Sequence, residues 1–347
     1  MALVLSWRGG GDRRGAAVAV VVALCSSCAT NGRSCSADSA RWAYKQLGSR
    51  WYAFAASGAQ RFELSIAHVQ SDAYAARSRV VVRCVAGELA LPVELLASRV
   101  RRVALCDFLT RRCCATMRQF EERAQNSSSF GDAPSSSGSG WAASKGGDLR
   151  MAHPGACILE QSSLQLLRAD DSSEWTLEAR FELGLPASGR TIEGRKAHTI
   201  LCETNDHQTK RQYSAQAAHE HVICAEDQAA LRGMPEPAGL VAFVPYVAIL
   251  PRLHGASELP MPSASALPFS SPDVLRVSAA LPSGKTLTGM GIRKGVNIIV
   301  GGGFHGKSTP LQAIELGVYN HVPGDGREFV SCLAFASKMR AEDGRAV

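Results

Sequence analysis

The chain has 347 residues, of which 46% are hydrophobic and 20% charged, and its formal net charge is +7. A chain of this length and composition buries a substantial core, and we expect two units rather than one. The modest basic excess favours polyanionic partners such as nucleotides or RNA, although many ordinary proteins carry as much.

The first forty residues have the composition of a targeting segment. Three arginines precede a short apolar run at residues 16–24, and small residues follow it. This order is typical of a signal or organelle-targeting peptide, and an unstructured start is the equal alternative. The run is too short to span a bilayer, and no later stretch offers eighteen continuous apolar residues. We therefore expect residues 1–40 to be a targeting or disordered segment, and no membrane span.

The eleven cysteines indicate a reduced, intracellular compartment. Their number is odd, and they lack the regular spacing of a secreted disulfide framework. Without a targeting function, the cytoplasm is the expected location. Cys25 and Cys28 have a metal-like spacing with Cys35 nearby, but no histidine or second pair completes a tetrahedral site, so we expect no zinc there.

Two strands and one long helix are predicted before a linker. The stretches "FELSIAHVQ" at residues 62–70 and "SRVVVRCVA" at residues 78–86 have the alternating or β-branched residues of strands. Apolar residues recur at helical spacing through residues 95–124. Residues 126–147 then have the serine, glycine and proline content of a flexible linker.

The predicted helix carries a group of arginines that raises the question of RNA binding. They could form a basic surface for nucleic acid, but solvated arginines on an outer helix face are commoner, and no aromatic residues are interleaved. Both interpretations stay open. The arginines are Arg99, Arg101, Arg102, Arg111, Arg112 and Arg118.

After the linker, strands and helices are again predicted. The stretch "EWTLEARFELGLP" at residues 174–186 suggests a strand pair, and residues 197–231 suggest helices. The apolar residues 239–252 indicate buried strands broken by Pro245, followed by a turn-rich passage.

Histidines in the middle of the chain do not form a recognisable metal motif. His219 and His221 flank Glu220, but a metalloprotease helix needs histidines four residues apart, and Ile223 stands at that position. We predict that these two histidines, and His198 and His207, are structural or lie on the surface.

A phosphate-binding loop is predicted near the end of the chain. The pattern Gly301-x-x-x-x-Gly306-Lys307-Ser308 follows the apolar residues 296–300, predicted to be a buried strand, and precedes a helical pattern that continues to residue 316. Glycines allow backbone N–H groups to surround phosphate oxygens, and the helix N-terminus adds a partial positive charge. Pro310 falls in the first helical turn, where its missing N–H is tolerated.

Each residue of this loop has an expected role. Lys307 would neutralise the β- and γ-phosphates, and Ser308 would place its hydroxyl on Mg²⁺. The backbone N–H of His305 is the expected contact, with its ring secondary. The predicted cofactor-binding residues are Gly301, Gly302, Gly303, Phe304, His305, Gly306, Lys307, Ser308 and Thr309.

Several stretches together resemble one family. These are "GMGIRKGVNIIVGGGFHGKST", "GVYNHVPGDGREFV", "EDQAALR", "RFELGLPASGR", "DFLTRR" and "HVQSDAYAARSRV". The chain resembles, from about residue 41 onward, the soluble P-loop ATPases of the ABC class. The resemblance implies an α/β fold: an accessory domain at residues 41–265 leads into an ABC-type nucleotide-binding core at residues 266–347, with ATP and Mg²⁺ as ligands.

The departures from the family affect the expected activity. Pro310 replaces the usual leucine, and the family's acidic strand end and signature loop lie downstream of the matching residues, so we expect an incomplete core. ATP binding with hydrolysis near background is then the first hypothesis, with a homodimer through a complete core. A non-enzymatic RNA-binding protein that uses the basic accessory domain is the second. The turn Gly324-Asp325-Gly326-Arg327 matches a family segment of unassigned role and is interpreted as structural.

Overall fold

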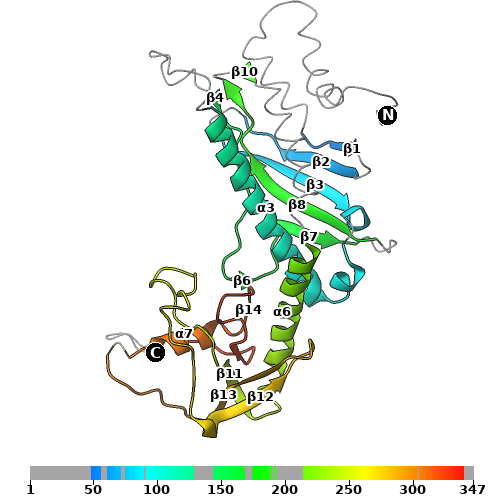
Figure 1. Ribbon diagram of the computed structural model, residues 1–347. Coiled ribbons are helices and arrows are strands. Elements are labelled where there is room, and N and C mark those ends of the chain that lie inside the picture. Colours follow the sequence, from blue (N-terminus) through cyan, green and yellow to red (C-terminus); the bar gives the residue numbers. More distant parts are fainter. Residues whose placement is uncertain are drawn as a thin grey trace, which may run out of the picture. The chain divides into compact units, whose positions relative to one another are not determined.

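The computed structural model describes much of the chain as a mixed α/β protein, as the sequence predicts (Figure 1). The expected targeting segment, residues 129–143 of the linker, and His198 and His207 lie outside the described residues. The described residues are 48–55, 61–71, 75–89, 91–128, 144–168, 174–188, 191–192, 214–303 and 305–339.

Two compact units make up the chain. Unit 1 comprises residues 1–91, 109–153 and 162–213, and unit 2 comprises residues 92–108, 154–161 and 214–347. Residues 214–265, which the sequence grouped with the accessory region, thus belong to unit 2 together with the phosphate-loop pattern.

Unit 1 contains an antiparallel sheet in the strand order β1-β2-β3-β8-β5, with β7 also paired to β8. A smaller sheet has the order β10-β9-β4. The strands are β1 (Trp51–Ala55), β2 (Arg61–His68), β3 (Ser78–Val85), β4 (Ser144–Lys145), β5 (Leu149–Arg150), β7 (Leu164–Leu167), β8 (Thr176–Leu183), β9 (Ala187–Ser188) and β10 (Thr191–Ile192).

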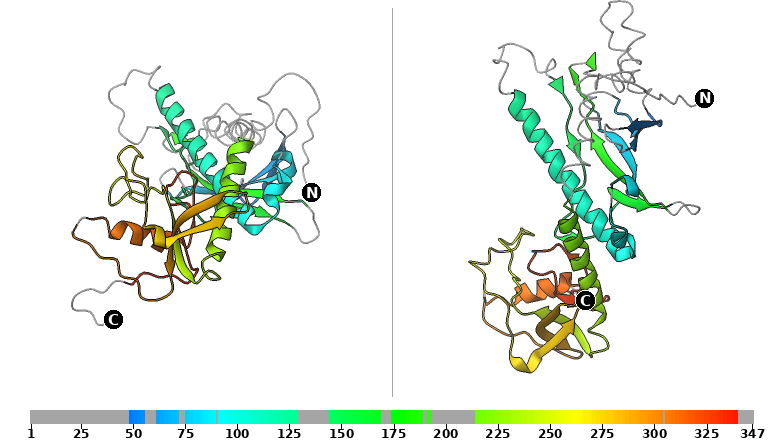
Figure 2. Two further views of the ribbon diagram at one scale, coloured as in Figure 1. Left: turned by 60° about the horizontal axis from the view of Figure 1, so that its bottom comes forward. Right: turned by 45° about the vertical axis from the view of Figure 1, so that its right-hand side comes forward.

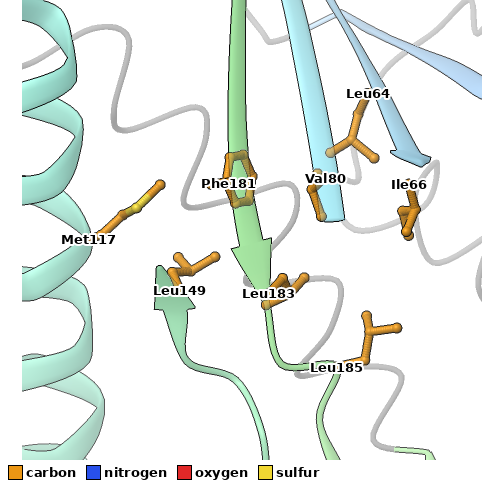
Figure 3. Close-up of a cluster of buried hydrophobic side chains, with 8 residues drawn as sticks. All are labelled: Leu64, Ile66, Val80, Met117, Leu149, Phe181, Leu183 and Leu185. Carbon is orange, nitrogen blue, oxygen red and sulfur yellow. The ribbon is translucent and has the colours of Figure 1, made fainter. Parts of the chain in front are cut away.

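One face of the larger sheet packs against the helix α3 (Arg99–Ser128), whose residues 109–128 belong to unit 1. Alternate residues of a strand point to the same face, so Leu64 and Ile66 of β2 lie beside Val80 of β3 and Phe181 of β8. Figure 3 shows Met117 of α3 pointing toward this cluster. Complete burial of one such side chain contributes about 1.5–3 kcal/mol.

The predicted strands and helix of this region are largely confirmed. Strands β2 and β3 and helix α3 match the three segments predicted before the linker. The strand pair expected at residues 174–186 is wrong, because residues 176–183 form one strand. Its register with β3 is unbroken from Ser78 opposite Leu183 to Val85 opposite Thr176.

Unit 2 contains a second antiparallel sheet, in the order β12-β13-β11-β15, and a two-stranded ladder of β6 and β14. The strands are β6 (Cys157–Ile158), β11 (Leu240–Pro245), β12 (Arg276–Ala280), β13 (Thr286–Arg293), β14 (Asn320–His321) and β15 (Ser331–Cys332). The helices are α6 (Ala215–Gly233), α7 (Ser308–Leu316), and the short 3₁₀ turns η2 (Val93–Leu96) and η4 (Asp273–Leu275); η1 (Ala86–Leu89) belongs to unit 1.

Strand β11 is buried on both faces. Phe243 packs with Leu231 of α6, whereas its neighbour Val244 packs with Ala313 of α7. Since successive residues of a strand point to opposite faces, the sheet lies between α6 and α7 (Figure 2). The apolar run of residues 240–245 is typical of a strand covered on both sides.

The second strand expected after Pro245 does not form. Proline has no N–H for a ladder, and Val247 adopts a left-handed conformation with φ of 61°, which turns the chain out of the sheet. The N–H of Val247 instead donates to the carbonyl of Phe269, at 3.0 Å. The passage predicted to be rich in turns after residue 252 contains no strand up to residue 272, apart from the isolated bridge between Arg252 and Pro260.

Within the part of the chain that the structure describes, no helix combines the length and hydropathy needed to cross a bilayer. Cys113, Cys114, Cys224 and Cys332 in that part are free thiols. Burial raises the pKa of the thiol to about 12 at Cys113 and to about 11 at Cys332.

Candidate functional site

The glycine loop adopts a conformation that requires glycine at two positions. Gly301 has φ of 152° and Gly306 has φ of 74°, in the region that residues with a side chain rarely adopt. At Gly302 an added Cβ would lie 3.0 Å from Cε1 of His305, whose exposed ring would have to shift slightly. The loop therefore keeps its backbone accessible, as a phosphate ligand requires. Phe304 lies outside the described residues.

Lys307 folds its side chain back across the loop. Its ammonium donates to the carbonyl of Gly301 at 2.7 Å and also to the carbonyl of Gly302. The positive charge of Lys307 thus lies next to the backbone of the loop, which the sequence predicts to surround a phosphate. Because both acceptors are neutral carbonyls, an anionic oxygen would be a stronger partner for the same ammonium.

Helix α7 begins at Ser308, directly after Lys307. Pro310 lies in the first turn, as predicted, and the N–H of Thr309 donates to the carbonyl of Gly306 at 3.0 Å. The N-cap residue, Lys307, makes no side-chain capping bond. N–H groups of a first turn have no partner within the helix, so this end is suited to an anion.

The loop is open to solvent. Gly301, Gly302, Gly303, His305 and Ser308 are all exposed. Among the described residues, no group of three or more histidine, cysteine or acidic side chains could hold a metal ion. Mg²⁺ commonly takes one or two protein oxygens, with phosphate oxygens and water as its other ligands. The exposed hydroxyl of Ser308 fits that kind of site.

The strand predicted before the loop is wrong. Residues 296–300 have no regular structure, and Val296 is 94% exposed, Ile298 79% and Val300 80%. The chain leaves the sheet after Arg293, where Gly295 has φ of 123° and the side chain of Asn297 donates to the carbonyls of both Arg293 and Gly295. The apolar composition predicted burial, but no described strand pairs with these residues.

The segment of residues 324–327 forms a turn that carries a buried charge cluster. Gly324 and Gly326 have φ of 81° and 79°, and a Cβ on Gly326 would lie 2.7 Å from the carbonyl oxygen of Ile249. Between them, the Asp325 carboxylate is only 3% exposed. It accepts a bond from Nη2 of Arg252 at 2.8 Å and lies 2.9 Å from Nδ1 of His321.

The electrostatics of the cluster follow from these contacts. Burial by itself raises the pKa of Asp325, but bonds from His321 and Arg252 and their charges outweigh it, so the pKa is below its ordinary value. The neighbouring Arg327 is 2% exposed and donates through Nε to the carbonyl of Leu250. Burial and the nearby Arg252 lower the pKa of Arg327 to about 10.

Sequence patterns did not identify Arg252, His321 or Gln228, which bonds to His321. The available signals were the family-like stretches that contain His321 and Gln228, and the spacing of four residues between His321 and Asp325. Partners of this kind come from distant segments, so local motifs rarely reveal them.

Several of the α3 arginines are committed to intramolecular bonds in unit 2. Arg101 forms a two-bond ion pair with Glu226, at 2.8 and 2.7 Å, and Arg99 pairs with Glu160 at 2.6 Å. Arg102 donates to the carbonyl of Leu96. These three side chains make their contacts within unit 2, which leaves fewer cations of this helix for nucleic acid.

The histidine prediction holds for the two described members. His219 is exposed, whereas His221 is buried and its Nε2 lies 3.1 Å from the Asp107 carboxylate. Its ring also stacks at a tilt against Phe108, with the centroids 5.5 Å apart. His221 is therefore a structural residue of unit 2.

Comparison with known proteins matches most of the chain to one family. Residues 39–206 match the family model for the N-terminal region of ATPases of the ABC class, and residues 214–347 match the model for the ABC ATPase P-loop domain. An uncharacterized protein of Methanocaldococcus jannaschii is 42% identical over 74 residues. That stretch covers 21% of this chain and 16% of that protein. Both family models and the mixed α/β fold lead to one conclusion: the chain belongs to the P-loop ATPases of the ABC class.

Proposed function

We propose that the chain binds the triphosphate of ATP in the loop of residues 301–309. The observation that carries the proposal is the position of Lys307, whose ammonium is held over the loop by two carbonyl oxygens at the start of α7. On binding, the ammonium exchanges these carbonyls for β- and γ-phosphate oxygens. Glycines at positions 301, 302 and 306 leave room for the backbone N–H groups to contact the same oxygens.

Ser308 is the proposed protein ligand of Mg²⁺. Its hydroxyl lies at the exposed start of α7, next to the proposed phosphate position. The remaining coordination would come from the phosphates and from water, which is the usual arrangement for this ion. The ion would bridge phosphate oxygens and neutralise part of their charge.

We propose that ATP turnover by this chain is little above background. Phosphoryl transfer requires a positioned water as well as bound phosphates. Among the described residues, no carboxylate forms an ion pair or hydrogen bond with Lys307 or Ser308. Family resemblance suggests that an acidic strand end and a partner's signature loop supply these groups, so a homodimer through a complete ABC-type core is the proposed active arrangement.

Titration with a fluorescent ATP analogue and Mg²⁺ tests the binding proposal. Lys307→Ala should weaken binding at least tenfold, because it removes charge-assisted bonds worth about 1.5–3 kcal/mol each. Lys294→Ala is the matched control, since Lys294 is an exposed lysine outside the loop. Equal affinity of the Lys307 variant and the parent chain would refute the proposal. Robust turnover that Lys307→Ala abolishes would instead refute the low-turnover part alone.

A further inference from the structure

The two ends of α7 are held differently. Its N-terminus is exposed, whereas its C-terminal carbonyls accept bonds from buried side chains. The thiol of Cys332 donates to the carbonyl of Ile314, at 3.0 Å. Nε2 of His321 lies 3.2 Å from the carbonyl oxygen of Leu316. The same two carbonyls also accept backbone bonds, from the N–H of Gly317 and the N–H of Tyr319, both at 3.0 Å, so several contacts hold this end of the helix.

The backbone of His321 is fixed by a side chain of α6. The Gln228 amide accepts from the N–H of His321 at 2.7 Å and donates to its carbonyl at 2.8 Å. Both residues are buried, and the paired bonds leave the His321 backbone little freedom. Nε2 of the ring contacts the Leu316 carbonyl, so the orientation of the ring also depends on the contact of its second nitrogen, Nδ1.

That second contact is the carboxylate of Asp325. Nδ1 of His321 lies 2.9 Å from Oδ2 of Asp325, and Arg252 donates to the same carboxylate and to the Asp325 carbonyl, both at 2.8 Å. A buried series of contacts thus runs from Arg252 through Asp325 and His321 to the end of α7. Both ring nitrogens of His321 therefore lie close to oxygen atoms, Nδ1 to the Asp325 carboxylate and Nε2 to the Leu316 carbonyl.

Helix α7 needs such an anchor. It has nine residues, fewer than an isolated helix requires for stability, and Ala313 is its one buried side chain among those described. A short helix moves as a rigid rod, so a shift at its last turn displaces its first turn as well. The first turn is the end that follows the glycine loop.

We propose that Arg252, Asp325 and His321 are positioning residues that hold the first turn of α7 in place for the nucleotide phosphates. This inference rests on the proposed nucleotide binding at the loop of residues 301–309. The three residues do not touch the phosphates in this proposal, and they act through the carbonyl of Leu316. Errors of about 1 Å in such positioning are known to reduce function strongly.

The test compares two buried aspartates of unit 2. Asp325→Asn keeps the shape but removes the charge, and we expect the dissociation constant for Mg²⁺–ATP to rise about five- to tenfold. Asp227→Asn is the matched control. Asp227 is also buried and accepts two bonds, but these come from the N–H and the hydroxyl of Ser283 and not from α7. The Asp227→Asn variant should have a lower melting temperature than the parent, and its dissociation constant for Mg²⁺–ATP should stay within twofold of the parent's.

Affinity is measured at a temperature where circular dichroism shows each variant folded, and amide hydrogen exchange is followed at residues 308–316. Faster exchange there in the Asp325 variant, with unchanged exchange in β11, supports the inference. A folded Asp325 variant with the affinity of the parent overturns it, as does an equal loss of affinity in the Asp227 variant. If Asp325→Asn does not fold, Arg252→Lys replaces it, because lysine keeps the charge but cannot make the paired bonds. A parent chain that binds no nucleotide refutes the proposed function instead.

Discussion

Substitution of Gly306 by alanine separates backbone strain from crowding in the loop. Gly306 has φ of 74°, and an added Cβ would meet no atom within 4 Å. The cost of alanine at this position is therefore purely conformational. For a residue with a side chain, this left-handed conformation is less favourable by about 1–2 kcal/mol.

The size of the effect on binding follows from that strain. Because the loop is exposed, it can relax away from the strained conformation when no ligand is bound. Binding would then have to restore it, and 1–2 kcal/mol corresponds to a loss of about five- to thirtyfold in affinity. The melting temperature should change little. Gly306→Asn should recover part of the loss, since asparagine tolerates this region better than alanine.

Gly255 provides a control in the same unit but outside the loop. It does not have a positive φ, and an added Cβ meets nothing within 4 Å, so Gly255→Ala should bind as the parent does. The assay is a titration with the fluorescent ATP analogue and Mg²⁺, together with thermal unfolding of each variant. Equal losses for both variants, or an unchanged affinity for Gly306→Ala, would show that the described loop conformation is not the one that binds.

Two further predictions concern acid stability and RNA. The pKa of Asp325 lies below its unfolded value of about 3.9, so its contribution to stability is present above that value and is lost as pH falls through the folded pKa. Urea unfolding of Asp325→Asn should therefore depend less on pH below about 5 than that of the parent, and parallel profiles would contradict this. If the α3 arginines bind RNA, log affinity should fall linearly with log salt, and reversing the charges of Arg111 and Arg112 should lower the slope. If the chain shows no measurable RNA binding at about 50 mM salt, the RNA hypothesis is refuted.

The elements that the sequence predicted correctly depend on patterns within a few residues. Alternation in residues 62–70 and 78–86 specifies β2 and β3, because a strand with one covered face repeats every second residue. Helical spacing of apolar residues predicts α3. Pro310 is compatible with the first turn of a helix, which agrees with the start of α7 at Ser308. The glycine loop is also predictable from local sequence, because positions 301 and 306 need glycine on account of their own backbone angles.

Burial and strand pairing depend on segments far apart in the chain, so local sequence patterns do not reveal them. Residues 296–300 are as apolar as β11, yet β11 is covered by α6 and α7 while the described segment beside the loop is exposed. The contacts among Arg252, Asp325 and His321 likewise bring together residues up to 73 positions apart. The glycine loop and the family could both be predicted from local residue patterns. The fold decided which charges are buried behind α7, because a side chain's solvent exposure is set by its neighbours in space.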